Sequence, residues 1–273
     1  MPLVKFPGAV EPDPDDRHIH LTDPDLFDEE AAGAKMSFLD HLDELRKRLI
    51  HAVVSVLVGV GATFYFHNQI YNFVFEPTRR VLPPHTSLIF TEPGEAFSLH
   101  LKIALIAGVL AAAPYIMYQV WLFIAPGLYS HEKKMAIPFV LLSTGGALAG
   151  AAFNHYVLFP FMMTFFGSFS SPETLFMPKL DPVFSLYTNF LIACVLIFQI
   201  PTVVFFLARM KLVTARFLVR HFKYAVLVTF VASAIMTPTG DPGTQTIFAL
   251  PMIGLYILSI GIAWIVAPAA TKL

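Results

Sequence analysis

Six long runs of apolar residues constrain this chain more than any other feature. A helix that crosses a membrane needs about 20 predominantly apolar residues. The runs lie near residues 49–66, 97–121, 135–159, 183–208, 224–236 and 247–266. Polar stretches rich in proline and glycine separate them, which is typical of loops between helices. We therefore predict an all-α integral membrane protein with six transmembrane helices.

The composition agrees with a membrane domain that follows a polar tail. Only 14% of the 273 residues are charged, whereas a soluble domain carries about 25%. Twelve of the 19 acidic residues fall within residues 1–48, where prolines also cluster. Such a composition is typical of disorder. We predict a disordered acidic tail over residues 1–36, a six-helix membrane domain over 37–267 and a short C-terminal segment over 268–273.

Lysine and arginine set the predicted orientation. Loops on the cytoplasmic side of a membrane carry an excess of these residues. With six spans, both termini and the second and fourth loops share one side, and that side holds 14 of the 18 lysines and arginines. Both termini are therefore predicted to be cytoplasmic.

Prolines and one short run predict an irregular bundle. Proline interrupts helical hydrogen bonding, and the runs contain Pro114, Pro138, Pro201 and Pro251. Several bent helices favour a curved bundle with a concave face. The fifth run has 13 residues, about 20 Å of helix, so the bilayer thins there, one end borders a polar recess, or the helix extends into its flanks.

Gly146 and Gly150 form a pair of small residues four apart in the third run. Such a pair allows two helices to approach closely. In a chain with six helices we expect internal packing, and contact with another subunit is the alternative.

Enzyme chemistry finds no support in the sequence. There is no phosphate-binding glycine loop, no His-Glu-x-x-His and no pair of intramembrane aspartates. Cys194 is the only cysteine, which excludes a disulfide framework and a cysteine-based metal site. The net charge of −1 gives no signal for nucleic acid. We predict a protein that is not an enzyme, with no cofactor, no metal and no nucleic-acid partner.

The segment Ser37–Ile50 has the pattern of an amphipathic helix that runs into the first apolar run. Ser37 can cap its start. One helical face carries four apolar residues at spacings of four, three and four: Phe38, Leu42, Leu45 and Leu49. Acidic residues precede the basic cluster Arg46-Lys47-Arg48, an order that suits the helix dipole.

Two acidic residues occupy special places outside the tail. Glu44 lies on this helix, and Glu132 lies in the second loop. One interpretation is that both pair with neighbouring basic side chains at the surface, which contributes little. The other is that two carboxylates on one face bind two consecutive arginines, because a guanidinium presents a planar fork that lysine lacks.

The segment Ser37–Ile50 resembles the start of the C subunit of the twin-arginine protein translocase, the TatC family. The stretch Tyr118–Tyr129, followed by residues 131–134, looks like the family's first cytoplasmic loop. Phe198-Gln199-Ile200-Pro201 sits where the family has a Glu or Gln before proline. Other family positions are matched by Pro77, Thr237-Pro238, Asp241 and Gln245. The resemblance covers about residues 37–264.

The resemblance implies a receptor for twin-arginine signal peptides on folded precursor proteins. It implies a glove-like bundle in the bacterial inner membrane. It also implies that this subunit assembles with further copies of itself and with single-span TatA- and TatB-type subunits. Export would draw on the proton-motive force.

The resemblance also assigns roles to particular residues. Glu44 and Glu132 would contact the arginine pair, and the surface around them would be completed by Leu45, Arg46 and Phe123. Gln199 would contact the partner subunits. Its alternative is a hydrogen bond to a neighbouring helix, and its amide does not titrate.

Two further positions are expected to serve structure or translocation. They are Pro77, after the first span, and Asp241, in the last external turn. Asp241 has a structural alternative, which is to cap the start of the sixth helix.

Two rival functions stay open. A small solute transporter would show internal repeats and a polar site at the membrane midplane, and the sequence shows no convincing repeat. A membrane scaffold would show no dependence on Glu44 or Glu132 in precursor binding.

Overall fold

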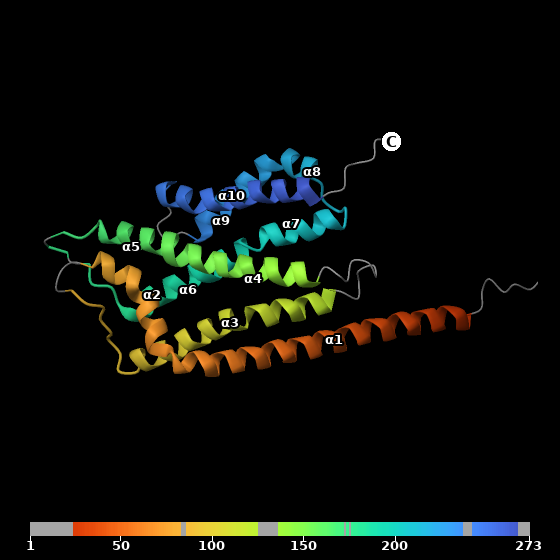
Figure 1. Cartoon of the computed structure of the whole chain (residues 1–273), viewed down its shortest axis with the longest axis horizontal. Coiled ribbons are helices and arrows are strands. Elements are labelled where there is room, and N and C mark those ends of the chain that lie inside the picture. The colour runs from red at the N-terminus through yellow and green to blue at the C-terminus, as the bar shows by residue number, and fades with distance from the viewer. Residues whose placement is uncertain are drawn as a thin grey trace, which may run out of the picture. The chain divides into compact units, whose positions relative to one another are not determined.

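The computed structural model describes residues 24–82, 86–124, 136–171, 173–174, 176–236 and 242–266, and these are almost entirely helical (Figure 1). They contain isolated β-bridges but no strand. The chain divides into two compact units, Met1–Lys47 and Arg48–Leu273. The helical content of the described residues agrees with the predicted all-α class.

The first helix begins earlier than predicted. Helix α1 runs from Pro24 to Tyr65, so it begins within the predicted tail, whose disorder stays a prediction. Proline is favoured at the first position of a helix, and the following residues are rich in alanine and glutamate, which are good helix formers. The rest of the predicted tail, residues 1–23, and the segment 268–273 lie outside the described residues.

The second unit contains the remaining helices. In chain order after α1 they are α2 (His67–Val81), α3 (Glu95–Ile124), α4 (Ala136–Phe153), the π-helical turn η4 (Asn154–Leu158), α5 (Phe159–Gly167), α6 (Leu180–Ile197), α7 (Ile200–Arg209), α8 (Ala215–Arg220), α9 (Phe222–Met236) and α10 (Pro242–Val266). Helices α4, η4 and α5 follow one another directly and form the third predicted span.

Five helical segments of the described residues are long and apolar enough to cross a membrane. They are Leu39–Tyr65, Glu95–Ile124, Ala136–Gly167, Leu180–Arg209 and Gln245–Val266. The fifth predicted span is present as α9, whose 15 residues reach about 22 Å. A hydrocarbon core is about 30 Å thick, so the crossing of α9 stays a prediction.

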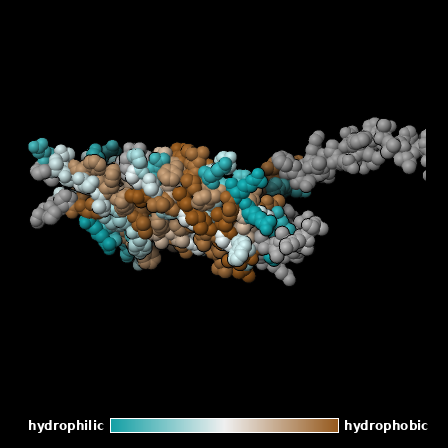
Figure 2. Space-filling model, turned by 90° about the horizontal axis from the view of Figure 1, so that it is seen from above, coloured by the Kyte–Doolittle hydropathy of each residue, from teal (hydrophilic) through white to brown (hydrophobic). Residues whose placement is uncertain are grey.

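Apolar side chains face outward along these helices, as a lipid-embedded bundle requires. Exposed examples are Val58, Leu141, Leu196 and Ile235. In Figure 2 hydrophobic residues cover the middle of the face shown, and hydrophilic residues gather toward its ends. The buried core of the second unit includes Phe75, Ile103, Phe159, Met162 and Phe190.

The prolines differ in whether they interrupt the helices that contain them. Phe198 and Gln199 form a turn between α6 and α7. Pro201 is the second residue of α7, and its ring nitrogen cannot donate to a carbonyl in the preceding turn. Pro114 and Pro251 lie inside α3 and α10, which continue through them. Pro138 is the third described residue of α4, and the bend predicted there stays a prediction.

The two glycines of the third span pack inside the chain, as predicted. A Cβ added to Gly146 would lie 2.8 Å from the carbonyl oxygen of Phe198. A Cβ added to Gly150 would lie 2.7 Å from the carbonyl oxygen of Cys194. Both distances are too short for real atoms, so only glycine allows α4 to approach the junction of α6 and α7 this closely.

We expect Gly146→Val to destabilise the bundle by roughly 1–3 kcal/mol, the usual cost of overpacking a filled interior. Gly145→Val is the matched control, because a Cβ there meets nothing within 4 Å. Thermal unfolding in detergent should show a lower midpoint for Gly146→Val and little change for Gly145→Val. Equal midpoints would contradict this account of the close approach.

Candidate functional site

Three of the predicted signal-peptide residues are consecutive on α1 in the first unit. Glu44 is partly buried, whereas Leu45 and Arg46 are exposed. Leu42 and Leu45 lie three positions apart, on one face of the helix, and 42% and 41% of their surfaces are exposed. These two leucines therefore form an exposed apolar strip on the same helix as Glu44.

The other two predicted signal-peptide residues belong to the second unit. Phe123 is partly buried, one residue before the end of α3. Glu132 lies within residues 125–135, outside the described residues. The shared face of Glu44 and Glu132 therefore stays a prediction.

An aromatic cluster joins the helices on both sides of residues 125–135. Trp121 of α3 is 2% exposed, and its ring centroid lies 5.2 Å from that of Phe139 in α4 and 5.3 Å from that of Phe206 in α7. The rings of Phe139 and Phe206 are 4.9 Å apart. Such aromatic contacts add to the stability of a core. The cluster fixes the end of α3, and therefore the backbone that carries Phe123.

Gln199 makes the hydrogen bond that the sequence left open as its structural alternative. It lies at the junction of α6 and α7, and its Nε2 donates to the carbonyl oxygen of Ser143 in α4 over 3.0 Å. Gly146, one turn further along α4, makes room for the junction. The bond ties the fourth span to the third. Gln199 is also partly exposed, and its predicted contact with partner subunits is not tested by this bond.

The two predicted structural positions have different outcomes. Pro77 is buried inside α2, beside the fully buried Thr78. Asp241 lies outside the described residues. Four residues later in the sequence, Gln245 donates from Nε2 to the carbonyl oxygen of Phe230 over 2.8 Å and thereby joins α10 to α9.

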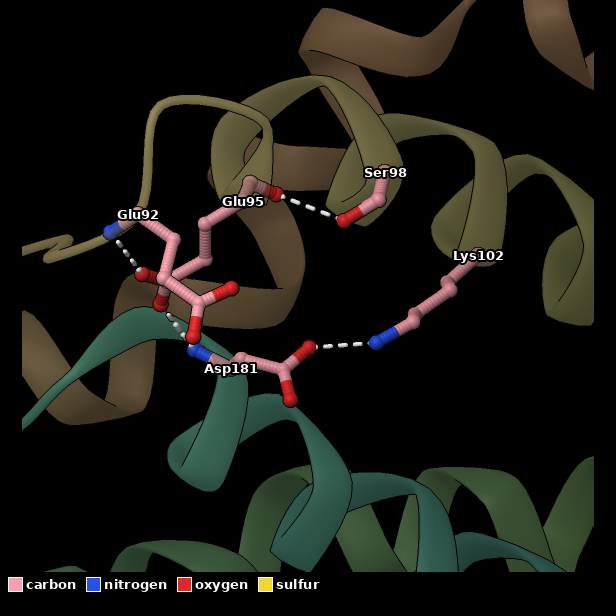
Figure 3. Close-up of polar contacts among 5 residues, drawn as sticks. All are labelled: Glu92, Glu95, Ser98, Lys102 and Asp181. Carbon is pink, nitrogen blue, oxygen red and sulfur yellow. Dashed lines mark hydrogen bonds and ion pairs between the residues drawn. The ribbon is translucent and has the colours of Figure 1, made fainter.

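A polar network at the start of α3 and α6 was missed by the sequence analysis (Figure 3). The Glu95 carboxylate accepts hydrogen bonds from the backbone N–H groups of Thr91 and Asp181, over 2.9 and 3.0 Å. Lys102 forms an ion pair with Asp181. Hydrogen bonds to charged groups are stronger than those between neutral groups. One carboxylate therefore fixes the loop before α3 to the start of α6.

The surrounding backbone reinforces this connection. Ile89 accepts a hydrogen bond from the N–H of Leu180 over 2.9 Å and donates to the carbonyl of Pro178 over 3.3 Å. The network borders a polar recess of about 340 Å³. The small number of acidic residues in the membrane domain was the one sequence feature that could have indicated this network. Only seven acidic residues follow residue 48, and the network uses two of them, Glu95 and Asp181.

We expect Glu95→Gln to lower the thermal midpoint of unfolding, because the neutral amide accepts the backbone N–H bonds less strongly than a carboxylate. Glu92→Gln removes the same charge from an exposed side chain in the same loop and should leave the midpoint unchanged. The midpoints are measured by differential scanning fluorimetry in detergent. A midpoint that falls equally in both variants would show that charge alone, and not the network, matters.

The described residues define a polytopic α-helical membrane protein whose spans are interrupted and cross-linked by a few polar side chains. A family model described as Sec-independent protein translocase protein (TatC) matches residues 40–251. The match contains every predicted site residue, from Glu44 to Asp241.

Individual relatives agree with this match. A protein of Koribacter versatilis (strain Ellin345), named Sec-independent protein translocase protein TatC, is 41% identical over 240 residues, covering 85% of this chain and 87% of that protein. A protein of the same name from Helicobacter pylori (strain J99 / ATCC 700824) is 39% identical, covering 84% of this chain and 89% of that protein.

A solved structure gives the same answer for the fold. The crystal structure of a twin arginine translocase receptor, TatC, in DDM superposes with a TM-score of 0.70 at 34% identity, covering 82% of this chain and 99% of that one. The chain belongs to the TatC family of Sec-independent protein translocase proteins.

Proposed function

We propose that this chain is the receptor and core subunit of a twin-arginine protein translocase. It binds twin-arginine signal peptides of folded precursors on the cytoplasmic face of the bacterial inner membrane and exports these precursors. The supporting observation is its likeness to a solved twin arginine translocase receptor over 82% of the chain at 34% identity. Its role is transport, not covalent catalysis.

Glu44 and Glu132 bind the two arginines of the signal peptide. A carboxylate accepts two parallel hydrogen bonds from a guanidinium, and a lysine ammonium cannot make this bidentate contact. Two carboxylates therefore distinguish an arginine pair from a lysine pair, which a simple negative charge does not.

The surface around Glu44 suits the rest of a signal peptide. Such peptides carry an apolar stretch after their positively charged start. Leu42 and Leu45 expose an apolar strip on the same helix as Glu44. Arg46 and Phe123 complete the recognition surface, as the family pattern implies.

Single-span TatA- and TatB-type subunits and further copies of the chain assemble around this receptor. Gln199 is partly exposed at the interrupted fourth span, and an intramembrane polar group is a functional hypothesis by default. Its side chain contributes one bond to Ser143 and another to a partner helix. The proton-motive force supplies the energy, and the amide of Gln199 does not carry the proton.

We expect Glu44→Gln and Glu132→Gln each to weaken binding of an Arg-Arg signal peptide about tenfold or more. A hydrogen bond to a charged group contributes about 1.5–3 kcal/mol, and 1.4 kcal/mol corresponds to a factor of ten. Binding is measured by photocrosslinking from a position beside Glu132 to a signal peptide in membranes, with a Lys-Lys version of the peptide for comparison.

Asp43→Asn is the matched control, because Asp43 is an exposed acid next to Glu44. It should leave crosslinking to the Arg-Arg peptide unchanged. Equal crosslinking of the Arg-Arg and Lys-Lys peptides, or full crosslinking in both glutamine variants, would refute the arginine-pair site.

We expect Gln199→Leu to reduce co-purification of the single-span subunits more than it reduces signal-peptide crosslinking. The variant loses the bond to Ser143 and any polar contact with a partner helix, and bonds of this kind in membranes average about 0.6 kcal/mol. Ser143→Ala is the control, because the acceptor for Gln199 is the backbone carbonyl, which this change keeps. Normal co-purification of the partners with Gln199→Leu would count against the partner contact.

A further inference from the structure

Five basic residues gather around α8 with no acidic residue nearby in the sequence. The turn from α7 to α9 carries Arg209, Lys211, Arg216, Arg220 and Lys223, all exposed. Residues 182–240 contain no Asp or Glu. Among the described residues, the ion pairs Arg80–Glu76 and Lys102–Asp181 lie elsewhere in the chain, and no ion pair there involves any of these five.

Helix α8 packs against α10, which fixes the backbone that carries its basic side chains. Leu218 is 6% exposed and packs with Ala263 and Ile260 of α10. The Tyr256 hydroxyl donates to the carbonyl oxygen of Leu218 over 3.0 Å. Arg216 and Arg220, one turn apart, therefore share an exposed face of a seated helix. Like charges at this spacing repel each other, and a bound anion relieves that repulsion.

Two recesses of different character meet at these two arginines. One, of about 530 Å³, is an apolar groove between α8 and α10, lined by Val219, Ile260 and Trp264 as well as both arginines. The other, of about 620 Å³, is lined by both arginines together with Phe217, His221, Lys223 and Tyr224. A ligand that fits both has an anionic head and an apolar tail.

We propose that Arg216 and Arg220 bind the phosphate of an anionic phospholipid whose acyl chain lies in the groove between α8 and α10. Arginine forks bind phosphate oxygens bidentately, and basic pockets between membrane helices bind anionic lipid head groups. Trp264 is 78% exposed at the groove, and tryptophan is enriched at the level of lipid head groups. The proposal uses none of the residues proposed for signal-peptide recognition and does not depend on the proposed function.

The test uses the full chain in vesicles of phosphatidylcholine that contain a tenth of phosphatidylglycerol, with bromine atoms on the acyl chains of one lipid at a time. Bromine quenches nearby tryptophan fluorescence. The chain has two tryptophans, so the Trp264 signal is the difference between the parent protein and Trp264→Phe. We expect brominated phosphatidylglycerol to quench Trp264 several-fold more than the same amount of brominated phosphatidylcholine.

The double variant Arg216→Gln/Arg220→Gln should lose this preference. Arg209→Gln/Lys211→Gln is the matched control, because it removes the same charge from the same turn but from neither recess, and it should keep the preference. Native mass spectrometry of the detergent-purified proteins gives a second readout, with retained phosphatidylglycerol lost only in the arginine variant.

Three outcomes would overturn the proposal. Equal quenching by the two lipids would show an ordinary lipid-facing surface. Equal loss of preference in both double variants would show general attraction by net charge. Release of the quenching by millimolar inorganic phosphate would show a site for free phosphate instead of a lipid.

Discussion

The close approach of α4 to the junction of α6 and α7 is the contact on which the second unit depends. Backbone groups freed by a broken helix are tolerated within a membrane only where protein covers them. Pro201 breaks the fourth span, and the glycines of α4 allow its backbone to cover the break. Gln199 then donates across the contact to Ser143. The proline, the two glycines and the amide therefore depend on one another, because each would destabilise the bundle without the others.

Two kinds of interaction hold the ends of helices in the second unit: hydrogen bonds to a carboxylate and packing of aromatic rings. At one end, Glu95 accepts backbone N–H bonds from two loops that are far apart in sequence. At the end of α3, the rings of Trp121, Phe139 and Phe206 lock three helices together. The polar network suits a region that meets water, and the aromatic cluster suits a region at the membrane interface. The segment 125–135, which carries Glu132 in our proposal, therefore follows a helix end that the aromatic cluster holds in place.

Apolar runs were enough to predict the spans, because their length and composition are local properties. Their ends were less accurate: the second, third and fourth spans continue beyond the predicted ends, as far as Ile124, Gly167 and Arg209. Helix α2 was read as a break because Pro77 and polar residues dominate residues 76–85. Glu95 was missed because its contact with Asp181 joins residues 86 positions apart, and no periodicity reports such a pair. The hydrogen bond of Gln199 to a neighbouring helix could not be predicted without the position of α4, which composition does not reveal.

The length of helix α9 and the basic turn before it both affect how this part of the chain fits a bilayer. Thr229 and Ser233 lie on the buried face of α9, each bonded within the helix, so α9 can pack closely on α10. At about 22 Å, it leaves several ångströms of a normal bilayer unmatched. A lipid held by Arg216 and Arg220 would set the membrane surface at the level of α8. The mismatch would then fall at the other end of α9, beyond Phe230, to whose carbonyl oxygen Gln245 of α10 donates.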